Sequence, residues 1–187
     1  MLAITSARDV NIRHRGNLNF IVPSISGSLT LATEAAGGEA GDITDADGGT
    51  LSITVTGLTT LEADGDITLD ATESNYNTLQ ILSGSNASIL DTFVETGLTI
   101  VGVAVTQSLT IATTSGLNLA GDVVAGQDIS LTAQESTQTF GPDILTDDLT
   151  FSPNVVLSSV AGNITLNIAD DVVMLTSNII SASNGIR

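Results

Sequence analysis

Residues 65–71 read Gly65-Asp66-Ile67-Thr68-Leu69-Asp70-Ala71, an aliphatic–polar–aliphatic triplet entered through a glycine and an aspartate. Apolar residues at positions i and i+2 lie on one face of a strand, and the threonine between them points to the other face. The triplet recurs along the whole chain, so we expect many short strands with one buried face and one solvent-exposed face. Its other instances are Leu29-Thr30-Leu31, Leu51-Ser52-Ile53-Thr54-Val55, Leu79-Gln80-Ile81, Leu98-Thr99-Ile100, Leu109-Thr110-Ile111, Leu117-Asn118-Leu119, Ile129-Ser130-Leu131, Leu149-Thr150-Phe151 and Ile164-Thr165-Leu166-Asn167-Ile168.

Turn-forming residues separate the triplets, as at Gly37-Gly38, Asp64-Gly65 and Ala161-Gly162-Asn163, which predicts corners between the strands. One segment, residues 169–180, has apolar residues at a roughly helical spacing. Its β-branched residues and its lack of a capping box favour strand there, with helix as the alternative.

The spacing of the triplets favours a solenoid. Leu79 and Leu98 are 19 residues apart, and Leu109, Ile129 and Leu149 follow one another at intervals of 20. A period of this length is typical of repeats that bury their apolar faces by stacking. We therefore expect an all-β protein, a parallel β-helix of about nine coils. An antiparallel β-sandwich is the alternative. The small number of aromatic residues and of hairpin turns counts against it.

Composition sets the character of the core. The chain has 187 residues, of which 42% are hydrophobic, with four Phe, one Tyr and no Trp. We expect one solenoid domain over residues 1–187 with an aliphatic core, residues 1–27 being a cap or first coil. With no cysteine, disulfides, thiolate zinc sites and cysteine nucleophiles are excluded. A mean hydropathy of +0.35 argues against intrinsic disorder.

Charge and hydropathy limit the partners. The net charge is −17, which repels phosphate backbones and anionic lipids, so we expect no nucleic acid partner. No apolar run is long enough for a membrane-spanning helix, and we expect no membrane insertion. The first residues do not form a secretory signal, so an export signal for an extracellular or cell-surface protein is expected to lie outside this chain.

Three segments carry a family resemblance: 65–71, Gly126-Gln127-Asp128-Ile129-Ser130-Leu131-Thr132-Ala133 and Gly162-Asn163-Ile164-Thr165-Leu166-Asn167-Ile168. They resemble the coil repeats of filamentous-haemagglutinin-type bacterial exoproteins, over about residues 28–187. The resemblance implies a right-handed parallel β-helix from the shaft of a secreted adhesin, without enzymatic activity in the shaft. The Asn-Pro-Asn-Leu motif of that family's secretion domain is absent from this sequence.

Parallel β-helices also include polysaccharide-active enzymes, and such an enzyme is the alternative function. A lyase requires a cation near its substrate, but Arg8, Arg13, Arg15 and Arg187 lie only at the two ends of the sequence. A glycosidase requires paired carboxylates. The two pairs are Asp147-Asp148 and Asp170-Asp171, both far in sequence from the one histidine, His14. We expect no catalytic residues and interpret both pairs as solvated coil corners.

One acidic segment, 42–49, resembles part of a calcium loop because carboxylates at alternate positions are followed by glycine. The candidate ligands are Asp42, Asp45 and Asp47. The twelfth position of an EF-hand loop would be Thr56 or Ile53, so that motif is excluded. No organic cofactor is expected, and calcium is the one ion that the sequence suggests. Glu62, Asp64 and Asp66 form a weaker acidic group.

Threonine-rich segments raise a third alternative, an ice-binding solenoid. Thr54, Thr56, Thr59 and Thr60 form one such group, and residues 110–114 contain another. Ice binding needs hydroxyls at regular spacing, and the threonines do not recur at one interval in the sequence. We therefore expect no register between them.

These observations predict a structural or adhesive module of a secreted or cell-surface protein, acting as a shaft or filament segment. Its expected partners are neighbouring coils or copies of the same protein end to end, and host or surface glycans or proteins. Recognition is expected on the longer loops, residues 32–50, 70–78 and 133–147.

Overall fold

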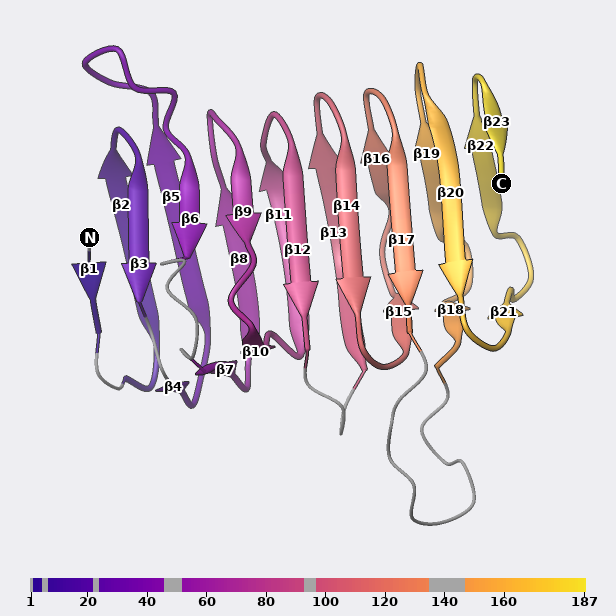
Figure 1. Cartoon of the computed structure of the whole chain (residues 1–187), viewed down its shortest axis with the longest axis horizontal. Coiled ribbons are helices and arrows are strands. Elements are labelled where there is room, and N and C mark those ends of the chain that lie inside the picture. The colour runs from indigo at the N-terminus through magenta and orange to yellow at the C-terminus, as the bar shows by residue number, and fades with distance from the viewer. Residues whose placement is uncertain (1, 5–6, 22–23, 46–51, 93–96, 135–146) are drawn as a thin grey trace.

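The fold is a stack of parallel β-coils that follow one another along one axis. The structure is a computed structural model, and it describes residues 2–4, 7–21, 24–45, 52–92, 97–134 and 147–187. Figure 1 shows successive strands lying side by side along the long axis, with the two chain ends at opposite ends of the stack. The described residues form 23 strands and no helix. The predicted all-β parallel solenoid is confirmed.

Sheet A has nine strands and runs the whole length of the stack. In spatial order its strands are β1 (Leu2–Ala3), β3 (Leu18–Ile21), β6 (Ile43–Asp45), β9 (Ile67–Leu69), β12 (Ala87–Asp91), β14 (Leu109–Thr113), β17 (Ile129–Ala133), β20 (Asn163–Ile168) and β23 (Gly185–Ile186).

Sheet C covers the opposite side of the core and has eleven strands. Its main path contains β2 (Val10–Arg15), β5 (Leu29–Glu34), β8 (Leu58–Glu62), β11 (Thr78–Ser83), β13 (Leu98–Val105), β15 (Leu117–Leu119), β18 (Leu149–Phe151) and β21 (Val172–Val173). Beyond β13 a second row continues through β16 (Val123–Ala125), β19 (Val156–Ser159) and β22 (Ile179–Ala182). A short third sheet contains β4 (Ser24–Ile25), β7 (Ser52–Val55) and β10 (Glu73–Asn75).

Strand pairing excludes the β-sandwich alternative. Every pair of named strands is parallel, and the one antiparallel contact among the described residues is the isolated bridge between Ala36 and Glu39. The segment 169–180, for which helix was an alternative, contains β21 and the start of β22. Parallel pairing throughout is what stacked coils produce, because each strand lies directly over its equivalent in the preceding coil.

The stack has about seven turns, fewer than the nine that a period of twenty predicted. Ile43 pairs with Ile67 and Ile129 pairs with Ile164, at spacings of 24 and 35 residues. The interval from Ile129 to Leu149 does not join equivalent positions, because Leu149 pairs with Leu117 on the other sheet. The two sheets carry the same triplet, so a count along the sequence cannot separate a step within a coil from a step between coils.

The core is a column of aliphatic side chains between sheets A and C. Ile111, Leu131 and Leu119 are fully buried, as the triplets predict. The middle residue of each of their triplets faces outward. Among the described residues, three aromatic side chains also lie inside: Phe20, Tyr76 and Phe151. Half-buried apolar residues pack against this core only at the two ends of the described stack, which leaves the column open there. At one end they are Leu2, Ile4, Ala7 and Ile12, and at the other Leu166, Ile168, Ile180 and Ala182.

Candidate functional site

A ladder of Asn and Asp side chains runs along the corner where the chain enters sheet A. Each side chain accepts a hydrogen bond, through Oδ1, from the backbone N–H of the equivalent residue one coil further on. The Asp66 N–H donates to Asp42 at 2.9 Å, and the Asn86 N–H donates to Asp66 at 3.0 Å. We call the accepting residues the corner ladder: Asn17, Asp42, Asp66, Asn86 and Asp128. The ladder satisfies backbone donors that the strand pairing leaves unpaired at each corner.

The ladder explains why glycine precedes aspartate in the repeat. A Cβ atom on Gly65 would lie 2.1 Å from Asp42 Oδ1, and one on Gly162 would lie 2.6 Å from Asp128 Oδ1. The glycine of one coil therefore leaves room for the carboxylate of the coil before it. The Gly-Asp or Gly-Asn dipeptide is a stacking signal, and it needs no ligand to account for it.

The structure turns two of the predicted calcium ligands in different directions. Asp42 belongs to the corner ladder, whereas Asp45 is only 2% exposed and faces the core. The third, Asp47, lies outside the described residues. Within the described part of the chain, no three His, Asp or Glu side chains are grouped as a metal site would require. Calcium binding by Asp42, Asp45 and Asp47 stays an untested prediction, and the burial of Asp45 does not favour it.

Asp45 is instead the centre of a buried polar cluster. Its carboxylate accepts hydrogen bonds from the N–H groups of Asp70 and Ala71, at 2.9 and 3.0 Å, and from the Tyr76 hydroxyl at 3.1 Å. Asp91, also buried, accepts one from the Tyr76 N–H at 3.1 Å. Alternation could have placed Asp45 correctly, because it lies two residues after the inward-facing Ile43.

Burial changes the acidity of this cluster. It raises the pKa of Asp45 above its ordinary value, and the hydrogen bonds from Asp70, Ala71 and Tyr76 oppose this effect only in part. It also raises the pKa of Tyr76 well above its ordinary value, with the negative charge of Asp45 as the second cause. Because the side chains of Asp45, Tyr76 and Asp91 are almost fully enclosed, the cluster is suited to holding the corner rather than to meeting a substrate.

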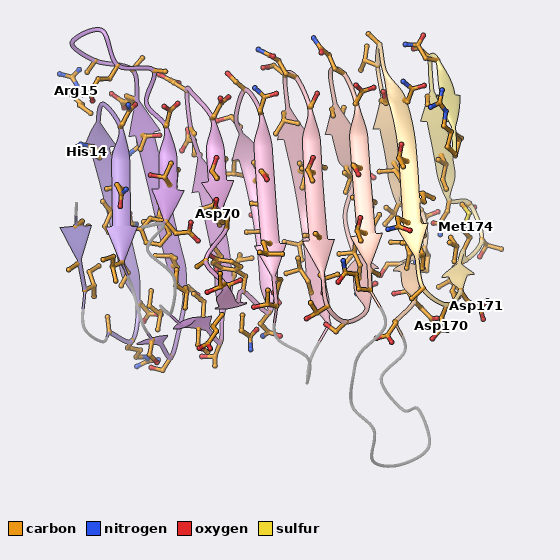
Figure 2. The ribbon with its side chains drawn as sticks, viewed as in Figure 1. His14, Arg15, Asp70, Asp170, Asp171 and Met174 are labelled. Atoms are coloured by element: carbon orange, nitrogen blue, oxygen red, sulfur yellow. The ribbon has the colours of Figure 1, made fainter. Side chains whose placement is uncertain are left out.

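The carboxylate pairs considered for a glycosidase lie at coil corners. Asp148 Oδ1 accepts a hydrogen bond from the Asp171 N–H at 3.1 Å, as one coil caps the next. Asp170 and Asp171 are exposed, but Asp147 is buried, contrary to the expectation that both pairs are solvated. Figure 2 places His14 at the opposite end of the stack from Asp170 and Asp171. The arrangement does not bring a histidine to either pair.

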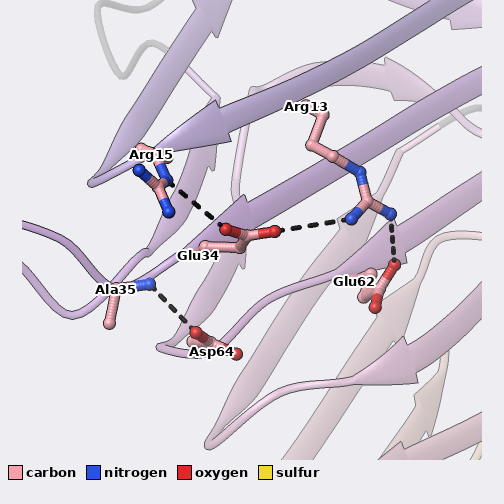
Figure 3. A network of polar contacts seen from close by, with 6 residues as sticks. All are labelled: Arg13, Arg15, Glu34, Ala35, Glu62 and Asp64. Carbon is pink, nitrogen blue, oxygen red and sulfur yellow. Dashed lines mark hydrogen bonds and ion pairs between the residues drawn. The ribbon is translucent and has the colours of Figure 1, made fainter.

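The basic residues of the first coil form ion pairs with acids of the next two coils (Figure 3). Arg13 lies 3.4 Å from Glu34 and 3.5 Å from Glu62, and Arg15 lies 3.6 Å from Glu34. All four side chains are substantially exposed, so each pair contributes little to stability. Arg8 differs: its side chain is 88% exposed, and its Nε lies 3.6 Å from Oδ2 of the neighbouring Asp9.

Hydroxyl side chains form a register on the outer face of sheet A that spacing in the sequence did not reveal. Thr44 pairs with Thr68, Thr68 with Ser88, and Ser88 with Thr110. The row continues through Ser130 and Thr165, and we call these six residues the hydroxyl row. The expectation that threonines share no register is therefore wrong for this face. Loops of different length absorb the variation in coil length, so the strands themselves stay aligned.

The predicted recognition loops are only partly described. In 32–50, residues 36–39 form a turn closed by the Ala36–Glu39 bridge, and residues 46–50 lie outside the described residues. In 70–78, β10 adds a strand to the short third sheet. Most of 133–147 also lies outside the described residues. Recognition by these loops stays a prediction.

The last coil exposes most of the large apolar side chains that are exposed in the described residues. Six of those eight lie between positions 172 and 186, the other two being Leu82 and Val160. The six are Val172, Val173, Met174, Leu175, Ile179 and Ile186. Figure 2 shows Met174 at this end, beyond the last strands of the stack. In the described structure β21, β22 and β23 each pair along one edge only.

No helix in the described residues could cross a membrane. In comparisons with known proteins, a family model described as Repeats of unknown function (DUF5649) matches residues 7–83. This segment includes the corner-ladder positions Asn17, Asp42 and Asp66. No curated protein and no solved structure matches the chain. The match supports a solenoid repeat protein, while an adhesin-type identity is not confirmed by any relative.

Proposed function

We propose that this chain is a structural shaft segment of a secreted or cell-surface protein, which extends or presents other parts and does not catalyse a reaction. The observation that carries the proposal is the continuous aliphatic core, open at both ends of the stack. A stack of this kind can build an extended rod, because every coil repeats the pairing of the coil before it.

The polar residues support the same proposal. The acids that a catalytic or metal site would use cap backbone N–H groups instead, as Asp42, Asp66 and Asp148 do. The buried acid Asp45 is held by three donors inside the core. In these contacts the acidic residues hold coils together, and we therefore propose that any ligand is bound by the loops or by neighbouring parts of a longer protein.

Immunogold labelling and protease treatment of intact cells of the source organism test the proposal. Antibody against this chain is expected to label the cell exterior, and added protease is expected to remove the label. Label confined to the cell interior would contradict it. A parallel screen of acidic and neutral polysaccharides, with and without calcium, tests the enzyme alternative. Turnover that is lost in Asp148→Asn or Asp171→Asn would replace the shaft proposal by a glycosidase.

The hydroxyl row favours ice binding as a second candidate function. Neighbouring strands of a sheet are about 4.8 Å apart, so the six aligned hydroxyl side chains form a regularly spaced row on the outer face of sheet A. The test is inhibition of ice recrystallisation by the wild-type chain and by Thr68→Lys/Thr110→Lys. Activity in the wild type that is lost in this variant would support the second candidate, and inactivity of the wild type would remove it.

A further inference from the structure

We infer that a proton-dependent clamp closes the outer edge of β10, and that this edge opens when the clamp loses its proton. Four residues make up the acid clamp: Asp45, Asp70, Tyr76 and Asp91. The inference concerns a strand inside the stack and does not rest on the proposed shaft function. Figure 2 shows Asp70 on the coil of β9, away from both ends of the stack.

The outer edge of β10 is closed by residues of the next coil. Among the described strands, β10 pairs only with β7. On its other edge the Ser74 N–H donates to Thr92 Oγ1 at 3.0 Å, and the Thr92 N–H donates to the Ser74 carbonyl at 3.0 Å. Directly after β10, the Tyr76 N–H donates to the Asp91 carboxylate at 3.1 Å. These contacts occupy backbone groups that could otherwise pair with another strand.

Asp45 holds the chain on both sides of β10. Before β10 its carboxyl group accepts hydrogen bonds from the N–H groups of Asp70 and Ala71, and after β10 it accepts one from the Tyr76 hydroxyl. Asp45 and Tyr76 are both buried, and Tyr76 in turn contacts Asp91 through its N–H. The acid clamp therefore joins three successive coils, and a loss of its contacts with Asp45 weakens the closure of β10.

One contact of the acid clamp requires a proton. The side chains of Asp45 and Asp70 are hydrogen-bonded to each other. An ionised carboxylate can only accept hydrogen bonds, so two carboxyl groups share one only while one of them is protonated. Asp70 is exposed, so this proton can exchange with solvent.

The titratable groups around Asp45 and Tyr76 are all acidic. Asp70 follows β9, Tyr76 follows β10, and Asp91 ends β12. Among the described residues, the partners of Asp45 are two N–H groups, a hydroxyl and a carboxyl group, and none is basic. When the shared proton leaves, Asp45 and Asp70 carry two negative charges side by side. Like charges in a buried site repel each other and favour contact with water.

The direction of the switch follows from the proton. Burial raises the pKa of Asp45, which agrees with a closed clamp that favours the protonated form. The edge of β10 is therefore expected to open as the pH rises through the folded-state pKa of Asp45. An open strand edge is a template for pairing with another chain, so the acid clamp controls whether β10 is accessible.

Native-state hydrogen exchange, followed by NMR between about pH 5 and about pH 8, tests the inference. Each observed exchange rate is compared with the intrinsic rate at the same pH to give a protection factor. The protection factors of the Ser74 and Tyr76 N–H groups are expected to fall at least about tenfold as the pH rises. At every pH they are expected to lie below that of Ile111, which is fully buried in β14. The edge then opens without unfolding of the stack.

Asp70→Asn is the decisive variant. Its side-chain amide can donate to Asp45 at any pH, so Ser74 and Tyr76 are expected to keep their protection within about threefold across the range. Asp66→Asn is the matched control, because it removes the same charge from another exposed acid of this coil. This control is expected to retain the pH dependence of the wild type.

Several results would overturn the inference. They are wild-type protection that does not fall with pH, protection equal to that of Ile111, and an Asp70→Asn variant that behaves like the wild type. Loss of the pH dependence in Asp66→Asn as well would assign it to general charge repulsion, against the inference. Circular dichroism verifies folding. If Asp70→Asn does not fold, a carbon-13 NMR titration of the wild type decides: coupled titration of Asp45 and Asp70 supports the shared proton, and independent titration rejects it.

Discussion

At the scale of single residues, the acidic side chains of this protein act mainly on the backbone. Asp66 accepts hydrogen bonds from both the backbone N–H and the side-chain amide of Asn86, at 3.0 Å each. Asn17 and Asn86 perform the same task as Asp42 and Asp66, so the ladder needs an acceptor oxygen and not a charge.

Asp66→Ala is expected to lower the free energy of unfolding by about 1 to 2 kcal/mol, because the Asn86 N–H loses its acceptor. Asp66→Asn is the matched control and is expected to change it by less than about 0.5 kcal/mol, since the amide oxygen can accept the same bond. Urea denaturation followed by circular dichroism measures both. Equal losses in the two variants would show that charge, and not the acceptor, is what matters.

The buried Asp45–Tyr76 pair gives stability a pH dependence. The folded-state pKa of Asp45 lies above the unfolded value, so folding favours the protonated carboxyl. The stability that the Asp45 carboxyl contributes is therefore fully present below its pKa in the unfolded chain. That stability is lost as the pH rises through its pKa in the folded protein. Tyr76→Phe is expected to raise the pKa of Asp45 further, because the hydroxyl hydrogen bond stabilises the carboxylate. A carbon-13 NMR titration of the Asp45 carboxyl checks this, and an unchanged or lower midpoint would contradict it.

Calcium is tested by the melting temperature in chelator and in an excess of calcium. The carboxylate of Asp45 faces the core and is held by three donors, so it would have to leave them to join Asp42 and Asp47. We therefore expect no change in melting temperature, whereas an ion bound to the folded state would raise it. A rise of about 3 °C or more, lost in Asp42→Asn, would establish the site.

At the scale of the strand, the alternation of buried and exposed faces determines how much each residue contributes to the free energy of unfolding. Strand β14 contains the buried Ile111 between the outward-facing Thr110 and Ala112. Its pairing with β12 and β17 carries this alternation unchanged from coil to coil.

Adjacent residues of β14 form a matched pair for mutation. Ile111→Ala is expected to lower the free energy of unfolding by about 2 to 5 kcal/mol, because it leaves a cavity in a fully buried site. Thr110→Ala, one residue away on the exposed face, is expected to cost less than about 1 kcal/mol. Chemical denaturation measures the two losses. Comparable losses would mean that the two faces of β14 are not distinguished by burial.

At the scale of the whole molecule, the charge is large and of one sign. The net charge of −17 opposes the compact state through self-repulsion. The ion pairs of the first coil, such as Arg13 with Glu34, are exposed and offset only a small part of this repulsion.

Salt is therefore expected to stabilise the protein. Raising sodium chloride from about 10 to about 300 mM shortens the Debye length to below about 10 Å and screens the repulsion between acidic residues. We expect the melting temperature to rise by several degrees in differential scanning calorimetry. A melting temperature that falls with salt would show that attractive ion pairs outweigh self-repulsion.

The sequence by itself determined the strands, their dry and wet faces, the aliphatic core and the corners. These are local properties: alternation along a strand and a glycine before an aspartate are visible within seven residues, as in 65–71. The acceptor role of Asp42 and Asp66 was missed, although the Gly-Asp signal was present.

Only the tertiary structure decided which strands pair, and therefore the coil count, the hydroxyl row and the identity of the three donors around Asp45. Pairing joins residues 18 to 35 positions apart, as Leu2 with Phe20 and Ile129 with Ile164. Loops of unequal length hide that register from any count along the chain. The two open ends are likewise a property of the stack. The sequence of a triplet does not show whether another strand pairs with it on both edges or on one edge only.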